Sequence, residues 1–426
     1  IYTGEDTLSL HDALPISACT ALIWQDTAHP LAPPHTMNTT QLPQHGEHAL
    51  LIGRIWQPDT GPVLVAVTPD SVLDLSPLAP TCSELLEQDQ PAARVRQFMA
   101  SGQATRLAET ATVLANSDET GRNPALPWFI APCDLQAVKA SGVTFVASML
   151  ERVIEEQARG DASRAEAVRQ AVVAVIGDNL RSVKPGSPES ARLKEVLLAQ
   201  GMWSQYLEVG IGPDAEIFTK AQPMSAVGSG ALVGIHPGSQ WNNPEPEIVL
   251  AANSRGDVVG ATLGNDVNLR DFEGRSALLL GKAKDNNASC AIGPFIRLFD
   301  EHFGIDDVRQ CDLSLKVQGP EGFVMQGSSS LSQISRDPLD LVGQAMGKYH
   351  QYPDGMMLFL GTMFAPTQDR HGPGQGFTHV VGDVVSVSTP LLGTLVNRVT
   401  TSDVAPPWSY GVSALMRDLA RRGLLA

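Results

Sequence analysis

Three acidic residues in the second half of the chain have a spacing that suits metal binding. Glu245 and Glu247 stand two apart in the segment PEPEIVL, which is typical of a β-strand. Alternate side chains of a strand point to the same face, so both carboxylates would share one face. Asp266 closes the next strand-like segment, VVGATLGND. Carboxylates gathered on one sheet face repel one another, and a hard cation such as Mg²⁺ compensates for that repulsion. The spacing leaves a second interpretation open, in which the three acids are solvent-exposed and unrelated.

The expected pairing of these two strands depends on the turn between them. Residues 254–257, SRGD, have the composition of a hairpin turn. If the two central residues form the loop, Glu245 lies opposite Asp266. A bulge at Gly260 would shift this register by one residue.

Two lysines, Lys282 and Lys284, follow the acidic cluster in the segment GKAKDNN. A lysine acts as a base only if its pKa falls well below about 10.4, and a nearby cation lowers it. For each lysine the alternative is an ordinary surface position at a helix end.

The composition counts against several classes of function. The chain has 426 residues and a net charge of −16, with 30 basic and 46 acidic residues. Nucleic acids and anionic membranes are therefore poor partners, because binding phosphate requires cationic patches. No apolar run approaches the roughly 20 residues of a membrane helix. The five cysteines form no CxxC pair, which fits a reducing cytoplasm. The chain also lacks the GxGxxG, GxxxxGK[ST], GxSxG and HExxH motifs.

The remaining patterns divide the chain into three expected parts. Ile1–Ser17 resembles the translation of a sequencing adapter, and we expect residues 1–36 to be an artefactual or disordered leader. Strand-like and then helical patterns predict a small N-terminal α+β domain over 37–128. Within the expected catalytic domain, 129–426, a helical stretch precedes many short strands with Gly- and Pro-rich turns. This texture favours a closed or sandwiched β architecture.

Several motifs in one order carry a resemblance to a known family. PEPEIVL, GNDVNLRDFEG and AKDNNASCAIGP, followed by LGTMFAP, VGDVV and LGTLVNRV, resemble the fumarylacetoacetate hydrolase superfamily over roughly residues 130–400. Within it the chain is most similar to the dehydratases of 2-keto-3-deoxy-pentonates (xylonate or arabinonate). The resemblance implies an α+β, mainly β fold, a mixed β-sandwich roll with a small N-terminal α+β domain.

The resemblance also implies roles for the residues named above. Glu245, Glu247 and Asp266 would hold Mg²⁺, with Mn²⁺ or Ca²⁺ as alternatives. Lys284 would be the catalytic lysine, and Lys282 is the less favoured choice.

Two further segments match the family near its substrate. DAEIFTK, residues 214–220, resembles the strand that precedes the ligands. Glu216 is then a candidate acid or base and Lys220 a pocket residue. Thr362 matches a Gly-Thr turn beside the substrate.

One segment departs from the family pattern. Hydrolases and decarboxylases of the family carry GLNYxxHxxE, and the matching stretch here is GVTFVASMLE, residues 142–151. Ser148 replaces the histidine and is expected near the substrate, while Glu151 remains as a candidate catalytic residue. The alternative for Glu151 is a solvated helix position, because Glu155 and Glu156 continue the same acidic face. Loss of a histidine that helps to activate water disfavours hydrolysis and favours a lyase.

These expectations combine into one function. The chain would be a cytoplasmic, Mg²⁺-dependent hydro-lyase of pentose catabolism that converts 2-dehydro-3-deoxy-D-pentonate into 2,5-dioxopentanoate. Its partners would be a small anionic 2-keto acid and copies of itself in a homodimer or homotetramer, with no nucleic acid or membrane. An acylpyruvate or fumarylacetoacetate-type hydrolase or decarboxylase is the alternative, and a non-catalytic metal-binding protein is a more distant one.

Overall fold

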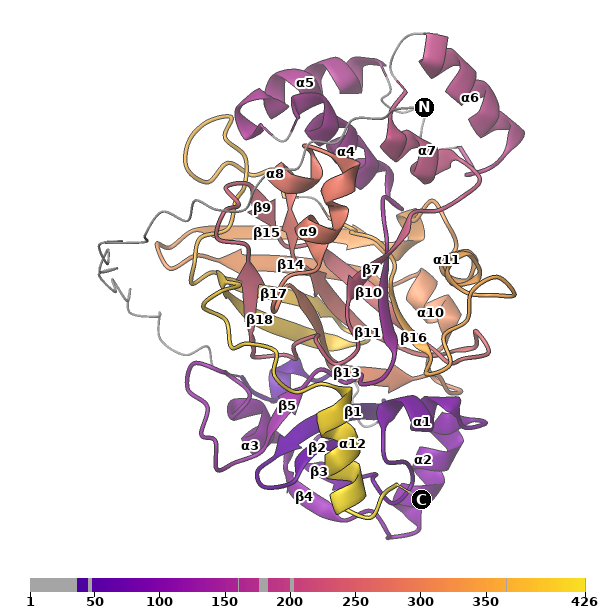
Figure 1. Ribbon diagram of the computed structural model, residues 1–426, viewed down its shortest axis with the longest axis vertical. Helices are drawn as coiled ribbons and strands as arrows, with labels where there is room; N and C mark the ends of the chain where they lie inside the picture. The colour runs from indigo at the N-terminus through magenta and orange to yellow at the C-terminus, as the bar shows by residue number, and fades with distance from the viewer. Residues whose placement is uncertain are drawn as a thin grey trace, which may run out of the picture. The chain divides into compact units, whose positions relative to one another are not determined.

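A computed structural model describes residues 37–44, 48–159, 161–175, 183–199, 203–364 and 366–425 (Figure 1). The expected leader, residues 1–36, lies outside the described residues. No helix in the described part is both long and apolar enough to cross a membrane.

The largest sheet takes strands from the N-terminal and the central parts of the chain. Its order is β4-β3-β2-β1-β13-β11-β10-β16-β6-β7, and β5 pairs with β1 beside this path. The strands are β1 (Leu51–Gln57), β2 (Gly61–Val67), β3 (Ser71–Asp74), β4 (Arg106–Glu109), β5 (Trp128–Ile130), β6 (Ala137–Ser141), β7 (Ile217–Ala221), β10 (Pro246–Ala252), β11 (Val258–Asp266), β13 (Cys290–Leu298) and β16 (Met356–Phe359).

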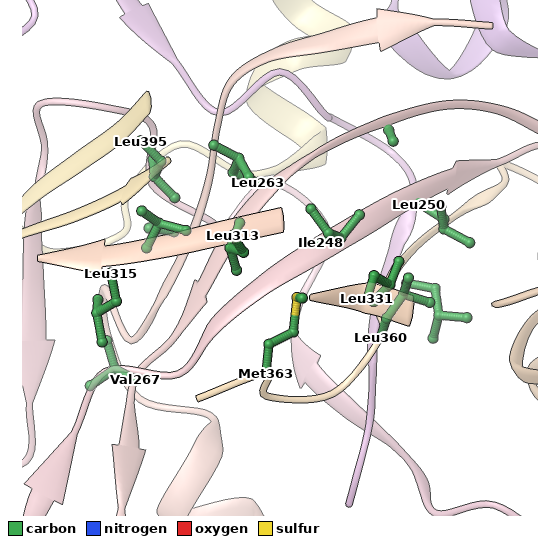
Figure 2. Close-up of a cluster of buried hydrophobic side chains, with 14 of the residues drawn as sticks. Ile248, Leu250, Leu263, Val267, Leu313, Leu315, Leu331, Leu360, Met363 and Leu395 are labelled. Carbon is green, nitrogen blue, oxygen red and sulfur yellow. The ribbon is translucent and has the colours of Figure 1, made fainter. Parts of the chain in front are cut away.

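A second sheet of five strands packs against the middle of the first. Its order is β15 (Val324–Ser330), β14 (Asp312–Gln318), β17 (Val384–Thr389), β18 (Gly393–Thr401) and β8 (Leu232–Ile235). A short pair, β9 (Asn242–Asn243) and β12 (Asn268–Leu269), stands apart from both sheets. Figure 2 shows Ile248 and Leu263 of the large sheet with Leu313, Leu315 and Leu395 of the small one in a single apolar cluster. Neither sheet closes on itself, so the expected mainly β sandwich is confirmed and a closed barrel is not formed.

The sequence of β10 reflects its central position. Ile248 and Leu250 contribute to the core between the sheets, whereas Val249 and Ala251 belong to a second core on the other face. A strand that is buried on both faces reads as a continuous apolar run, which is what PEIVLAA is. Charged residues at the start of such a strand are therefore carried into the interior.

The pairing of β10 with β11 has the expected register, although the turn between the strands differs from the prediction. Asp266 N donates to the carbonyl oxygen of Glu245 at 2.9 Å, so these two residues lie opposite each other as predicted. The predicted two-residue loop is wrong, because Asn253 N donates to Asp257 O at 3.0 Å and three residues form the loop. A bulge where Ala252 pairs with Val258 restores the expected register. The two departures cancel before the strands reach the acidic residues.

Four of the helices lie between β6 and β7 in the sequence. These four are α4 (Val146–Ala158), α5 (Ala162–Val175), α6 (Pro188–Ala199) and α7 (Gln205–Ile211). The apolar face of α4, with Met149 and Val153, packs against Leu207 of α7. The others are α1 (Cys82–Glu87), α2 (Pro91–Ala100), α3 (Thr110–Ala115), α8 (Arg270–Glu273), α9 (Leu280–Lys284), α10 (Ile305–Arg309), α11 (Pro338–Ala345) and α12 (Val412–Arg421), with 3₁₀ turns η1 (Thr39–Gln41), η3 (Ala277–Leu279) and η4 (Leu331–Gln333).

The expected domain boundary near residue 128 stays a prediction. Strand pairing continues across it, because Leu51 of β1 pairs with Arg297 of β13. The small N-terminal α+β part and the central part therefore share one sheet.

Candidate metal and acid-base site

The three predicted ligands converge at one end of the β10–β11 pair. Glu245, Glu247 and Asp266 are only 3%, 1% and 1% exposed as whole residues, which removes the solvent-exposed interpretation. One carboxylate oxygen from each lies within 4.8 Å of the others. Gly361 N donates to Glu247 Oε2 at 2.7 Å. Gly361 has a φ of +94°, and a Cβ there would stand 2.1 Å from Thr144 Oγ1, so only glycine brings the backbone this close.

Two buried lysines pair with these carboxylates. Lys284 Nζ lies 2.5 Å from Glu245 Oε2 and 3.0 Å from Asp266 Oδ2. Lys220 Nζ lies 2.8 Å from Asp266 Oδ1 and also donates to the carbonyl oxygen of Lys284. Lys284 ends α9, and this bond satisfies a carbonyl that the helix terminus leaves free. Lys282 is exposed over the ring of Phe272, at 5.2 Å from its centre. The geometry therefore brings Lys284, and not Lys282, to the acidic cluster.

A second set of buried charges comes from helices α4 and α8. Arg152 pairs with Glu245, with Glu155 at 2.7 Å and with Glu273 at 3.0 Å. Arg270 Nε lies 3.1 Å from Glu155. All five side chains are almost fully buried. Sequence reasoning missed this set and treated Glu155 as part of a solvated face; the signal was Arg152, one helical turn after the buried Met149 on the apolar face of α4.

The protonation equilibria of the site follow from burial and from these charges. Burial, with the nearby Glu273, raises the pKa of the Glu216 carboxyl to about 7. Burial also raises the pKa of the Glu247 carboxyl, and Asp266 and Glu245 add to the shift. Burial would raise the pKa of Asp266 as well, but Lys220 and Lys284 outweigh it and hold that pKa below its usual value.

The remaining predicted residues divide into those that reach the site and those that do not. One small cavity is lined by Glu216, Thr362, Lys284, Arg152 and two of the predicted ligands, Glu245 and Glu247. Glu151 is absent from its lining and pairs with Arg169 at 2.8 Å instead. Ser148 belongs to α4, but its side chain lies outside the described part of the structure. The catalytic and substrate-binding roles of these residues stay predictions.

The donor set fits a divalent cation. Carboxylate oxygens are the ligands that Mg²⁺ prefers. The described ionic cluster holds six carboxyl groups and four cationic side chains, so it has two excess negative charges when every carboxyl is ionised: Glu155, Glu216, Glu245, Glu247, Asp266 and Glu273 against Arg152, Lys220, Arg270 and Lys284. A buried excess of this kind is costly unless a cation compensates for it. Glu245, Glu247 and Asp266 would hold that cation.

Known proteins resemble this chain in sequence. Residues 207–400 match the family described as fumarylacetoacetate (FAA) hydrolase, C-terminal. The chain is 30% identical over 213 residues to the probable 2-keto-3-deoxyxylonate dehydratase of Haloferax volcanii, covering 50% of this chain and 68% of that one. It is 30% identical over 184 residues to the 2-dehydro-3-deoxy-D-arabinonate dehydratase of Saccharolobus solfataricus, covering 43% of this chain and 58% of that one.

Solved structures share the fold. The apo form of a 2-keto-3-deoxy-D-arabinonate dehydratase superposes with a TM-score of 0.55 at 20% identity, covering 83% of this chain and 99% of that chain. A structure of that name complexed with magnesium and 2,5-dioxopentanoate gives a TM-score of 0.54 at 20% identity, with the same coverage.

The chain belongs to the fumarylacetoacetate hydrolase family, as its motifs predicted. The names of the two relatives also confirm the expected enzyme class, a hydro-lyase.

Proposed function

We propose that this protein catalyses the Mg²⁺-dependent dehydration of 2-dehydro-3-deoxy-D-pentonate to 2,5-dioxopentanoate. The observation that carries the proposal is the burial of Lys284 between Glu245 and Asp266, beside the third carboxylate of a metal-binding set. The names of the two relatives, and the product bound to the magnesium-containing neighbour, support this substrate class.

The first step of the proposed reaction is removal of a proton from C3 of the substrate. When bound, Mg²⁺ would polarise the 2-keto group and offset the negative charge of the substrate. Lys284 would remove a proton from C3, which is acidic because it neighbours the ketone. In the metal-free arrangement burial lowers the pKa of Lys284, but Asp266 and Glu245 outweigh it and raise that pKa. A cation held by the same carboxylates would reverse that balance and let the lysine act as a base.

The second role is protonation of the leaving group. Glu216 lines the same cavity as Lys284, and its pKa of about 7 keeps much of it protonated near neutrality. It would deliver a proton to the C4 hydroxyl as the C4–O bond breaks and a C3=C4 double bond forms, so that one water leaves. Protons then move from C5 to C3 and from the C5 hydroxyl to C4, which yields the C5 aldehyde. No electron donor or acceptor is required.

The proposal also includes a cellular compartment and an oligomeric state. We place the enzyme in the cytoplasm, where the four cysteines of the described residues, all free and buried, would stay reduced. We expect a homodimer or homotetramer on the basis of the family resemblance.

The test is a substrate panel with the purified protein. Consumption of 2-dehydro-3-deoxy-D-pentonate, with 2,5-dioxopentanoate reported by a semialdehyde dehydrogenase, is the expected result. The L-isomer and 2-keto-3-deoxy-hexonates define specificity. Cleavage of acylpyruvates without dehydration of any sugar acid would overturn the proposal in favour of a hydrolase.

A further inference from the structure

A second cavity lies next to the one that holds the acid-base residues. The inner cavity, with Lys284, has a volume of about 10 Å³, room for about one water molecule. The outer cavity, with Tyr206, has a volume of about 110 Å³. Glu216 and Glu273 line both cavities, so these two side chains stand where the cavities meet.

Glu273 has hydrogen-bonding capacity that the described protein does not use. It is only 5% exposed. Its Oε2 lies 3.0 Å from Arg152 Nη1 but accepts no hydrogen bond in the described part of the chain. A carboxylate oxygen that makes an ion pair but accepts no hydrogen bond keeps a free acceptor site, which a hydroxyl of a bound molecule can use.

If the 2-keto acid end of the proposed substrate lies at Lys284 in the inner cavity, its far end points to the junction where Glu216 and Glu273 stand. The 2-keto acid end would lie at Lys284, and C4 would lie at Glu216. The next carbon, C5, then reaches the junction at Glu273, and anything longer enters the outer cavity. A carboxylate at this point repels a second anionic group but accepts a hydrogen bond from a hydroxyl.

We propose that Glu273 is a specificity-determining residue that accepts a hydrogen bond from the C5 hydroxyl of the substrate. This inference rests on the proposed dehydration and deepens it, because it explains how the site selects a hydroxylated sugar acid over a 2-keto acid with an apolar tail. The outer cavity receives the part of the substrate beyond C4. Its wall is completed by Gln205, Tyr206, Val209, Ala277 and Leu280.

The experiment compares two substrates that differ only at C5. They are 2-dehydro-3-deoxy-D-pentonate and its 5-deoxy analogue, 4-hydroxy-2-oxopentanoate of the same configuration at C4, and consumption of each is followed by proton NMR. A hydrogen bond to a charged group predicts that the wild type prefers the hydroxylated substrate in kcat/KM by roughly 10- to 100-fold. In Glu273→Met this preference falls to within about threefold, because kcat/KM drops further for the pentonate, which loses the hydrogen bond, than for the analogue, which never made it. An unchanged preference in Glu273→Met, or no preference in the wild type, overturns the inference.

Two further variants keep the test decisive. Asp271→Asn is the matched control on the same helix; its side chain accepts from Ser239 and Gln240, away from both cavities, and the preference should not change. If Glu273→Met does not fold by circular dichroism, Ala277→Leu decides, because Ala277 is exposed and its enlargement narrows the outer cavity. We expect a loss of about tenfold or more for the pentonate and a smaller loss for the analogue; equal losses contradict the inference.

The outcomes also separate this inference from the proposed function. A wild-type protein that does not consume the pentonate at all contradicts the dehydration itself. A wild-type protein that consumes it, with a preference that neither variant alters, contradicts only the role of Glu273.

Discussion

The two halves of the site are held in different ways. Glu245, Glu247 and Asp266 stand at the end of β10 and β11, whose backbones are fixed by pairing with each other and with neighbouring strands. Arg152 and Glu273 come from helices and are held by side-chain ion pairs.

This difference indicates that the two halves have different functions. Oxygen ligands on paired strands keep their spacing whether or not a cation is bound, which suits a metal site. Charges that are held only by other charges can exchange partners when a cation or a substrate arrives. Changes in the strand half should therefore abolish function, and changes in the helix half should shift rate, specificity or stability.

The largest effect is expected from the strand half. Asp266→Asn removes a metal ligand and leaves Lys220 and Lys284 without their common partner. Mg²⁺ binding by calorimetry should be lost, and turnover should fall by more than the roughly 100-fold typical of residues behind the ligands. Glu301→Gln, a change at an exposed acid, is the control and should leave both unchanged. Normal Mg²⁺ affinity in Asp266→Asn would refute the ligand assignment.

The two lysines give the next largest contrast. Lys284→Ala should reduce kcat by about 10²- to 10⁴-fold, the range for loss of a general base. Lys282→Ala should change kcat by less than about twofold, because Lys282 lies outside the acidic cluster. Steady-state kinetics with saturating Mg²⁺ measures kcat for both variants. A large loss in Lys282→Ala with little change in Lys284→Ala would mean that Lys282 is the catalytic lysine.

A substitution in the helix half should lower the unfolding free energy of the protein. Arg152→Met leaves Glu155 and Glu273 buried without this partner. Breaking such a buried pair costs about 3–5 kcal/mol of unfolding free energy. Arg169→Met, at a partly exposed pair with Glu151, should cost about 0–1 kcal/mol. Urea unfolding measures the two, and equal losses would show that the buried set is not distinct from a surface pair.

The smallest effect is a pH dependence at the junction of the two halves. The pKa of Glu216 is raised from 4.5 to about 7 by burial and by Glu273. A carboxyl whose pKa is higher in the folded chain contributes stability below its unfolded pKa and loses it as pH rises through the folded value. The contribution of Glu216 to the unfolding free energy of the metal-free protein should therefore decline between about pH 4.5 and pH 7, so wild type should lose stability relative to Glu216→Gln over this range. An unchanged slope in Glu216→Gln would contradict the raised pKa.

The strand half could be predicted from the sequence because its signals are local. The apolar run of β10 and the two-residue spacing of Glu245 and Glu247 predict a shared strand face, and the turn composition predicts the hairpin that brings Asp266 close to them. The loop length was predicted wrongly, but the bulge near Gly260 compensated for it.

The helix half could not be predicted in the same way. Arg152 and Glu155 are three residues apart on α4, and this spacing is equally typical of a solvated helix. Their partner Glu273 is distant in sequence, within a motif that the family resemblance highlighted without giving this residue a role. Arg152, Glu155 and Glu273 form a buried ionic set only because α4 packs near α8.

The proposed function is tested most directly by the formation of 2,5-dioxopentanoate from 2-dehydro-3-deoxy-D-pentonate with Mg²⁺ and with EDTA. A Mg²⁺-dependent dehydratase gives product with Mg²⁺, none with EDTA, and recovers when Mg²⁺ is restored. Equal product formation in EDTA would contradict a metal site at Glu245, Glu247 and Asp266 that is required for the reaction. No product under either condition, with acylpyruvates cleaved instead, would contradict the dehydration itself.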